Sequence, residues 1–200
     1  MNSKRIDISK LSKIGIFSAL SVVLYFLRFP LPIFPEFLKI QFSALPLVII
    51  GYTLGPIEGM IALVIKTLVC LPFTSTMYVG DLADFLICTS YILTTSLMYK
   101  ANKTKKSAAI SLFVGSVFWL IMAMLANYFI LIPFFINVML KGNVAGFVGM
   151  CSVIPGITID NYRLYYLLYA AIPFNLIITT AVSLVTFVVY KRISKILSRY

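Results

Sequence analysis

Two carboxylates lie three residues apart at the start of an apolar stretch, in the sequence GDLADFLICTSY. At this spacing Asp81 and Asp84 would share one face of a helix. Such a pair could act as general acid and base, take part in a proton relay, or orient a polar solute at a membrane surface. Acid–base catalysis needs a partner base or a metal ion, and the chain contains no histidine. The sequence therefore predicts no catalytic residue and no metal site.

Two interpretations of these carboxylates stay open. At a helix start they would meet free backbone N–H groups and the positive end of the helix dipole. Alternatively, they would line the outer rim of a solute cavity. Asp84 lies deeper in the expected helix than Asp81, which makes Asp84 the better candidate for ligand contact.

Three further polar side chains lie inside apolar stretches, where an unpaired polar group is costly. Asn127 and Asn175 carry amides that either bond to neighbouring helices or meet the edge of a planar heterocycle. Lys66 lies in the middle of ALVIKTLV and needs a carboxylate, a cluster of carbonyls or water. A structural ion pair and a substrate contact are both possible for this lysine.

The elements that would position these residues are membrane helices. The chain is 61% hydrophobic and 12% charged, with a mean hydropathy of +1.02. A water-soluble protein of 200 residues could not bury that much apolar surface. We therefore expect an all-α integral membrane protein embedded in the lipid bilayer.

Positive charge indicates how the protein is oriented. The chain has 17 basic and 6 acidic residues, and most of the basic residues lie in three short flanks. These are Lys4, Arg5, Lys10 and Lys13, then Lys100, Lys103, Lys105 and Lys106, then Lys191, Arg192, Lys195 and Arg199. The positive-inside rule predicts that all three flanks, and so both termini, are cytoplasmic. Basic residues interleaved with exposed aromatics are absent, which disfavours nucleic-acid binding.

Hydrophobic runs of suitable length predict six crossings in a single membrane domain, 1–200. The expected helices cover residues 11–29, 42–52, 56–71, 80–99, 108–133 and 164–190. The proline-rich PLPIFPEFLKI predicts an extended external loop. The apolar, glycine-rich connection 137–163 predicts a partly buried cap or a re-entrant piece.

Small residues recur along the first helix at i, i+3, i+4 and i+7. They are Gly15, Ser18, Ala19 and Val22. Such a stripe allows another helix to approach closely, either within the protein or from a partner.

Four segments together resemble a known family. FPLPIFPEFLKIQFSALPLVIIGYTLGP, GDLADFL, NYFILIPFF and AIPFNLII are similar to the riboflavin-binding S-components of energy-coupling factor (ECF) transporters, in order along nearly the whole chain. The resemblance implies a six-helix bundle that binds a vitamin at the external face. It also implies partners, namely a transmembrane T-component and two ATPase subunits that hydrolyse the ATP, so that this chain is not an enzyme. Riboflavin would be the transported ligand, with no cofactor.

The resemblance also implies site residues. Asn127 and Asn175 match asparagines that contact flavin in the family, with Gly80 near the same cavity. The loop from Pro30 to Gln41 would be the gate, and the small-residue stripe would dock on the partner module. The complete predicted ligand site comprises Phe37, Leu38, Lys39, Gln41, Gly80, Asp84, Asn127 and Asn175.

The chain departs from the family pattern at four positions. Ile178 replaces a lysine, Gln41 and Ala44 replace aspartates, and Asp84 replaces an asparagine. The ligand is therefore either riboflavin held differently or a related heterocyclic vitamin or precursor. A membrane assembly protein without transport function is a further alternative, although it would not need amides inside its helices. An intramembrane enzyme would need a nucleophile–base or metal constellation that the chain lacks.

Overall fold

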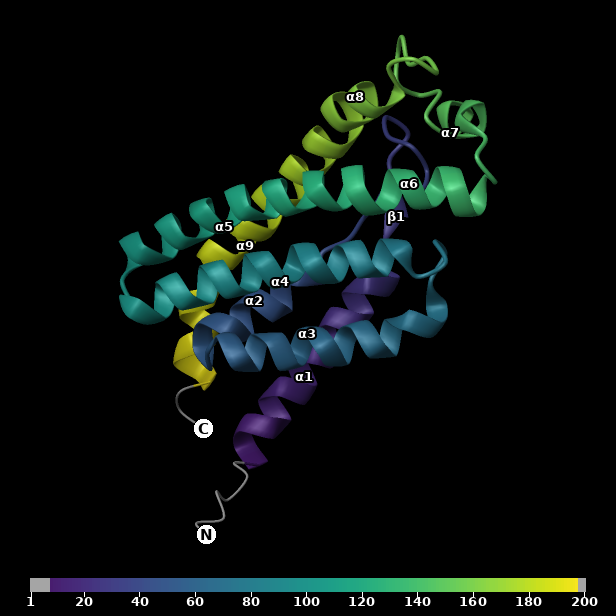
Figure 1. Cartoon of the computed structure of the whole chain (residues 1–200). Coiled ribbons are helices and arrows are strands. Elements are labelled where there is room, and N and C mark those ends of the chain that lie inside the picture. Colours follow the sequence, from purple (N-terminus) through teal and green to yellow (C-terminus); the bar gives the residue numbers. More distant parts are fainter. Residues whose placement is uncertain (1–7, 198–200) are drawn as a thin grey trace.

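The computed structural model describes residues 8–197, with only the backbone described at residues 191 and 193–197. Lys4, Arg5 and Arg199 of the predicted basic flanks lie outside the described residues. The chain is helical almost throughout (Figure 1), and its one sheet in the described part is a two-stranded hairpin.

The elements follow one another in a simple order. They are α1 (Ile8–Phe26), β1 (Phe29–Pro30), β2 (Lys39–Ile40), α2 (Ala44–Thr53), α3 (Pro56–Cys70), α4 (Val79–Ala101), α5 (Lys105–Ala126), α6 (Ile132–Phe134), α7 (Val144–Met150), α8 (Tyr162–Tyr166) and α9 (Ile172–Leu197). A 3₁₀ turn, Leu71–Phe73, extends α3. Three π-helical turns, Asn127–Leu131, Phe135–Met139 and Leu167–Ala171, join α5 to α6, follow α6, and join α8 to α9.

Five of these helical segments are long and apolar enough to cross a membrane. They are Ile8–Phe26, Pro56–Phe73, Val79–Ala101, Lys105–Met139 and Tyr162–Tyr190. The predicted first helix, 11–29, was placed three residues too far along the chain. The predicted fifth helix, 108–133, was too short because the π-helical turns carry the helix past Pro133.

The predicted second crossing differs most from the structure. Helix α2 has ten residues, and ten residues rise only about 15 Å, about half of a hydrocarbon core of about 30 Å. Eight of the ten are buried, so the helix is surrounded by protein rather than lipid. In place of the predicted second membrane helix, the chain has this short internal helix and the loop that leads into it.

The helices form a bundle with two different ends. The starts of α1 and α3 meet at one end, where Lys10 pairs with Glu58. Tyr52, Tyr99 and Tyr190, near the ends of α2, α4 and α9, cluster at this end too. Figure 1 shows the α4–α5 turn there and the β1–β2 hairpin and α7 at the opposite end. The basic flanks that lie within the described residues are thus gathered at one end.

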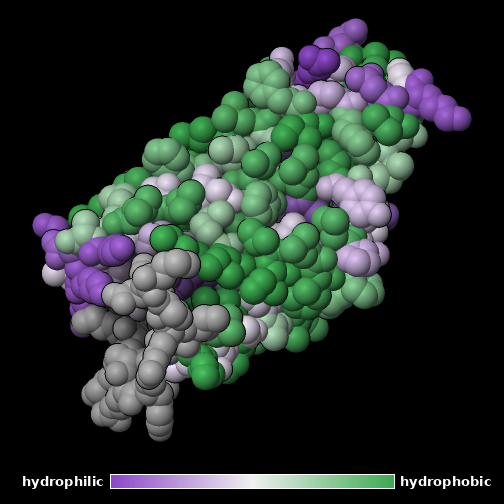
Figure 2. Space-filling view, turned by 60° about the horizontal axis from the view of Figure 1, so that its bottom comes forward, coloured by the Kyte–Doolittle hydropathy of each residue, from purple (hydrophilic) through white to green (hydrophobic). Residues whose placement is uncertain are grey.

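The surface agrees with a membrane setting. Figure 2 shows a broad apolar band between polar patches at the two ends of the molecule. Large exposed apolar residues occur on every long helix, for example Ile16, Leu68, Leu97, Phe113 and Leu184. Contact of such a band with lipid tails is favourable, whereas its exposure to water would be unfavourable.

The proline-rich loop and the long connection lie together at the end opposite the basic flanks. The loop is folded back on itself, with Phe29 paired to Ile40 and Pro30 to Lys39. The connection contains α7, whose Phe147 is 1% exposed, and Cys151 and Ile154 are buried close behind it. The connection therefore forms a partly buried cap, one of the two predicted forms.

Candidate ligand-binding site

A cavity of about 130 Å³ lies beneath the β1–β2 hairpin. The N-terminal end of α2 forms part of its wall, through Ser43 and Ala44. The cavity therefore occupies space that a full-length second helix would fill. All eight residues of the predicted ligand site line it, namely Phe37, Leu38, Lys39, Gln41, Gly80, Asp84, Asn127 and Asn175.

Asn127 is held by two hydrogen bonds. Its Nδ2 donates to the carbonyl of Ala123 (2.8 Å), one helical turn earlier. Its Oδ1 accepts from the hydroxyl of Tyr166 (2.7 Å), which comes from α8. An amide nitrogen carries two hydrogens, so one N–H of this 2%-exposed side chain remains for another acceptor.

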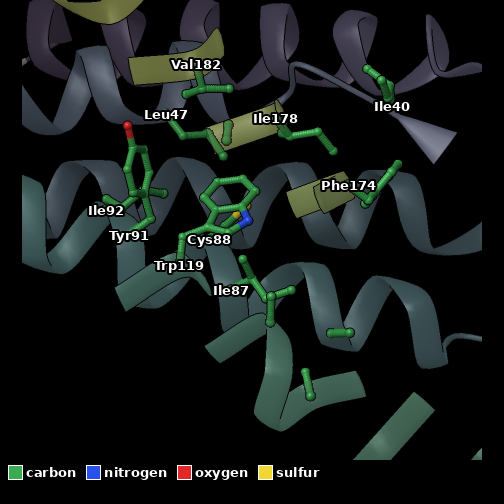
Figure 3. Packing of buried hydrophobic residues seen from close by; sticks show 14 of the residues in the cluster. Ile40, Leu47, Ile87, Cys88, Tyr91, Ile92, Trp119, Phe174, Ile178 and Val182 are labelled. Atoms are coloured by element: carbon green, nitrogen blue, oxygen red, sulfur yellow. The ribbon is translucent and has the colours of Figure 1, made fainter. Parts of the chain in front are cut away.

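Asn175 repeats the same arrangement on α9. Its Nδ2 donates to the carbonyl of Ala171 (2.9 Å), and its Oδ1 accepts from Nε1 of Trp119 (2.9 Å). Trp119 lies in the middle of the core, between Ile87 and Cys88 of α4 and Ile178 of α9 (Figure 3). The indole fixes which way the Asn175 amide points, and again one amide N–H stays available.

Both asparagines lie where prolines disturb their helices. Pro133 and Pro173 cannot donate a backbone N–H, so the regular hydrogen-bond ladder is interrupted one turn earlier. A π-helical turn precedes each proline, Asn127–Leu131 and Leu167–Ala171. Turns of this kind widen the helix locally and often occur at functional sites.

Asp81 is in the first turn of α4 but does not act as its cap. The residue before the helix is Tyr78, and its side chain forms no cap bond. The carboxylate of Asp81 instead accepts a hydrogen bond from the hydroxyl of Tyr25 on α1 (2.8 Å). Asp81 and Tyr25 both line the cavity, so Asp81 lies at its rim as well as in the first turn of α4, where the helix dipole favours an acid.

Asp84 lies one turn deeper and is already bonded on both oxygens. Nζ of Lys66 is 2.5 Å from Oδ2, and Nε2 of Gln41 donates to Oδ1 (2.7 Å). Lys66 is 2% exposed and does not line the cavity. Of its two predicted roles, the structural ion pair is therefore the one the structure supports.

Aromatic side chains close the site from above. The ring of Phe37 lies 4.8 Å from that of Phe135 and 5.9 Å from that of Tyr166. Phe34 meets Phe174 edge-to-face at 5.5 Å. These contacts hold the hairpin loop down on the ends of the last helices.

Several residues that line the cavity were not predicted as site residues from the sequence. Trp119 orients Asn175, and Tyr25 makes α1 part of the cavity wall. Ser43 immediately precedes α2. Arg28 lies over the Tyr25 ring (4.1 Å) at the same rim. The single tryptophan in an apolar run was a usable signal, whereas the inward position of Ser43 depends on the short length of α2.

The small-residue stripe on α1 is divided by the bundle. Ser18 is 2% exposed, and its hydroxyl donates to the carbonyl of Ile14 (2.8 Å) on the side that faces α3. Gly15 and Ala19 are exposed, and Val22 is half-buried. Ser18 therefore does not belong to an exposed docking face, and the docking role of the other three stays a prediction.

Comparison with known proteins agrees with this fold and cavity. Residues 9–190 match the family model described as ECF transporter, substrate-specific component. The riboflavin transporter RibU of Staphylococcus aureus is 30% identical over 190 residues, covering 95% of this chain and 93% of that one. The riboflavin transporter FmnP of Bacillus subtilis is 32% identical over 129 residues, which is 63% of this chain and 68% of that one.

A solved structure is also similar over most of the molecule. The S component of a bacterial ECF transporter superimposes with a TM-score of 0.70 at 29% identity, covering 94% of this chain and 96% of that one. The fold and the matches define a multi-pass membrane protein that serves transport. This chain belongs to the substrate-specific components of ECF transporters.

Proposed function

We propose that this protein binds riboflavin, or a closely related flavin, at the external face and passes it to an ECF module. Two relatives that bear the name riboflavin transporter support this ligand. The observation that carries the proposal is the pair of asparagines in one cavity, each with its carbonyl occupied and one amide N–H to spare. A flat heterocycle with acceptors on its edge matches two such donors.

The walls suit the rest of a flavin ring. Phe135, Leu131, Phe174 and Ile178 give the cavity apolar faces beside the two amides. Sites of this kind derive affinity from apolar contact and orientation from a few fixed polar groups. Ile178, where the family pattern has lysine, would contribute contact rather than charge.

Binding requires the lining to move. The cavity has a volume of about 130 Å³, whereas sites for ligands of this size have roughly 300–1,000 Å³. The hairpin loop from Pro30 to Gln41 would be the segment that opens, because a second hollow of about 660 Å³ lies between the loop and residues 149, 150, 152 and 153 and offers room for it to move. This loop would be the gate.

The energy for import would come from partners. In the proposed complex a transmembrane T-component and two ATPase subunits hydrolyse ATP, and this chain supplies specificity alone, without a cofactor. The three accessible members of the stripe, Gly15, Ala19 and Val22, would form the docking face. Both termini would be cytoplasmic, since the start of α1 and the end of α9 lie at the basic end of the bundle.

Titration of the detergent-solubilised protein with a panel of vitamins tests the ligand. We expect riboflavin fluorescence to be quenched at nanomolar concentration, and other heterocyclic vitamins to compete weakly or not at all. Tight binding of a different vitamin, without flavin binding, would retain the transport class and reject the substrate. The replaced family positions, Ile178, Gln41, Ala44 and Asp84, make that the second candidate.

A further inference from the structure

A chain of hydrogen bonds from the lipid-embedded core ends at the cavity wall. Lys66 on α3 contacts Asp84 on α4, and Asp84 accepts from Nε2 of Gln41, which follows β2. Lys66 lies behind Asp84, away from the cavity, whereas Asp84 and Gln41 line it. The three residues therefore link two helices to the end of the hairpin loop.

This series of contacts decides which end of the Gln41 amide bonds to Asp84 and which end is left over. An ionised carboxylate can only accept hydrogen bonds, so Gln41 must offer its NH₂ group to Asp84. Asp84 forms an ion pair with Lys66, and the carboxylate of such a pair acts as a hydrogen-bond acceptor. The carbonyl Oε1 of Gln41 is consequently held in one orientation as a pure acceptor.

That acceptor is buried and unused within the described part of the chain. Oε1 of Gln41 has no hydrogen-bond partner among the described residues, and neither has Oγ of Ser43, two residues later. Buried polar atoms in proteins are nearly always paired. Other side-chain atoms within the described residues are also buried and unpaired, but only these two belong to residues that line the cavity.

Ser43 is unusual for a serine at the start of a helix. A serine in this position normally caps the helix through its side chain. Here the residue is itself in the helical conformation (φ −61°, ψ −23°) and forms no side-chain cap bond. Its hydroxyl belongs to a residue that is 1% exposed and lines the cavity, and it has no hydrogen-bond partner among the described residues.

We propose that Gln41 and Ser43 form an acceptor subsite, which receives an N–H or O–H donor of the ligand, with Lys66 and Asp84 as positioning residues. The inference rests on the proposed flavin ligand and extends it. The asparagine wall supplies donors and the Gln41–Ser43 wall supplies acceptors, so the ligand is oriented by complementary edges. A flavin carries donors in two places, the ring imide N–H and the hydroxyls of its ribityl chain.

Two matched serine variants test the subsite in the full-length protein. Ser43→Ala removes the unpaired hydroxyl of a residue that lines the cavity, and Ser96→Ala removes an equally buried, unpaired hydroxyl of a residue that does not line it. We expect Ser43→Ala to weaken riboflavin binding roughly three- to tenfold and Ser96→Ala to leave it unchanged. Gln41→Met, which keeps the length and removes the acceptor, should weaken it by about tenfold.

Ligand analogues identify the donor. N3-methylriboflavin lacks the imide N–H, and lumiflavin lacks the ribityl hydroxyls. For one of these two analogues, Gln41→Met should cause no further loss, because the donor that Gln41 receives is already missing. If the wild type binds riboflavin but both Gln41→Met and Ser43→Ala bind it equally well, the subsite is wrong while the flavin proposal stands. If the wild type binds no flavin, the proposed function itself fails.

The positioning role has its own test. In the double variant Lys66→Met/Asp84→Asn both charges are absent, and an asparagine can donate as well as accept, so Gln41 is no longer oriented. We expect this double variant to weaken riboflavin binding about as much as Gln41→Met, and to add nothing when combined with Gln41→Met. Additive losses in the triple variant would show that the ion pair acts only through structure, and would overturn the positioning role.

Discussion

At the residue scale, the apolar core contains two asparagines whose hydrogen-bonding groups are only partly used by the protein itself. The side-chain carbonyls of Asn127 and Asn175 accept hydrogen bonds from Tyr166 and Trp119, respectively. Each amide keeps one N–H free. The neighbours thereby turn two ambiguous amides into defined donors. Rotation of either amide would turn its oxygen toward the backbone carbonyl of Ala123 or Ala171, so both amides keep this orientation.

Replacement of Asn175 tests that arrangement. We expect Asn175→Leu to weaken riboflavin binding by more than tenfold, about 1.4 kcal/mol or above, because a donor to the ligand is lost. Fluorescence titration measures the affinity. Asn102→Leu serves as control, since Asn102 is exposed in the α4–α5 turn at the far end of the bundle. Unchanged affinity in Asn175→Leu would mean that the amide is only structural.

At the scale of elements, pairs of helices are joined by single polar contacts across apolar interfaces. Lys66 and Asp84 join α3 to α4, Tyr25 and Asp81 join α1 to α4, and Lys10 joins α1 to Glu58 on α3. An ion pair inside a bundle adds little when compared with apolar packing, but removal of one partner leaves a buried charge.

The ion pair between α3 and α4 therefore makes a strong prediction for stability. Lys66→Met should destabilise the protein by roughly 3 kcal/mol or more, because Asp84 would lose its cation. The double variant Lys66→Met/Asp84→Asn should recover most of that loss. Thermal unfolding in detergent compares the three proteins. Equal unfolding midpoints for the single variant and the wild type would contradict a buried pair.

Helix α1 carries the prediction for partner docking. Its membrane span is less buried than those of the other four long segments, and Ala19 is exposed on it. We expect Ala19→Trp to retain riboflavin binding and to abolish uptake in cells that contain the ECF module, because the indole would prevent close helix approach. As a control, Leu184→Trp, at an exposed position of α9, should leave uptake intact. Normal uptake by Ala19→Trp would exclude this docking face.

At the scale of the whole molecule, the two ends of the bundle differ in charge and in structure. The end with the α4–α5 turn carries most of the described lysines, and the other carries the hairpin, α7 and the cavity beneath them. In the proposed complex, the solute and the ECF module would meet opposite ends of the same protein.

Cysteine labelling in intact cells measures this orientation. Lys141→Cys and Lys103→Cys place exposed thiols at the two ends, whereas the native Cys70, Cys88 and Cys151 are buried. A membrane-impermeant maleimide should label Lys141→Cys from outside and reach Lys103→Cys only after the cells are opened. The reverse pattern would place both termini outside the cell.

The amino-acid sequence by itself determined the membrane class, the five long helices and the family resemblance. These depend on local quantities, namely hydropathy over about 20 residues, charge at the flanks and short motifs. It also singled out Asn127, Asn175 and the residues of the loop, because polar or proline-rich segments stand out against an apolar background.

Only the tertiary structure decided how those residues are used. It showed that α2 ends halfway, that Ser18 faces inward, and that Lys66 pairs with Asp84 rather than with a solute. Each of these outcomes depends on a neighbour far away in the chain. Hydropathy shows that a polar side chain needs a partner, but the partner itself is set by how the helices pack.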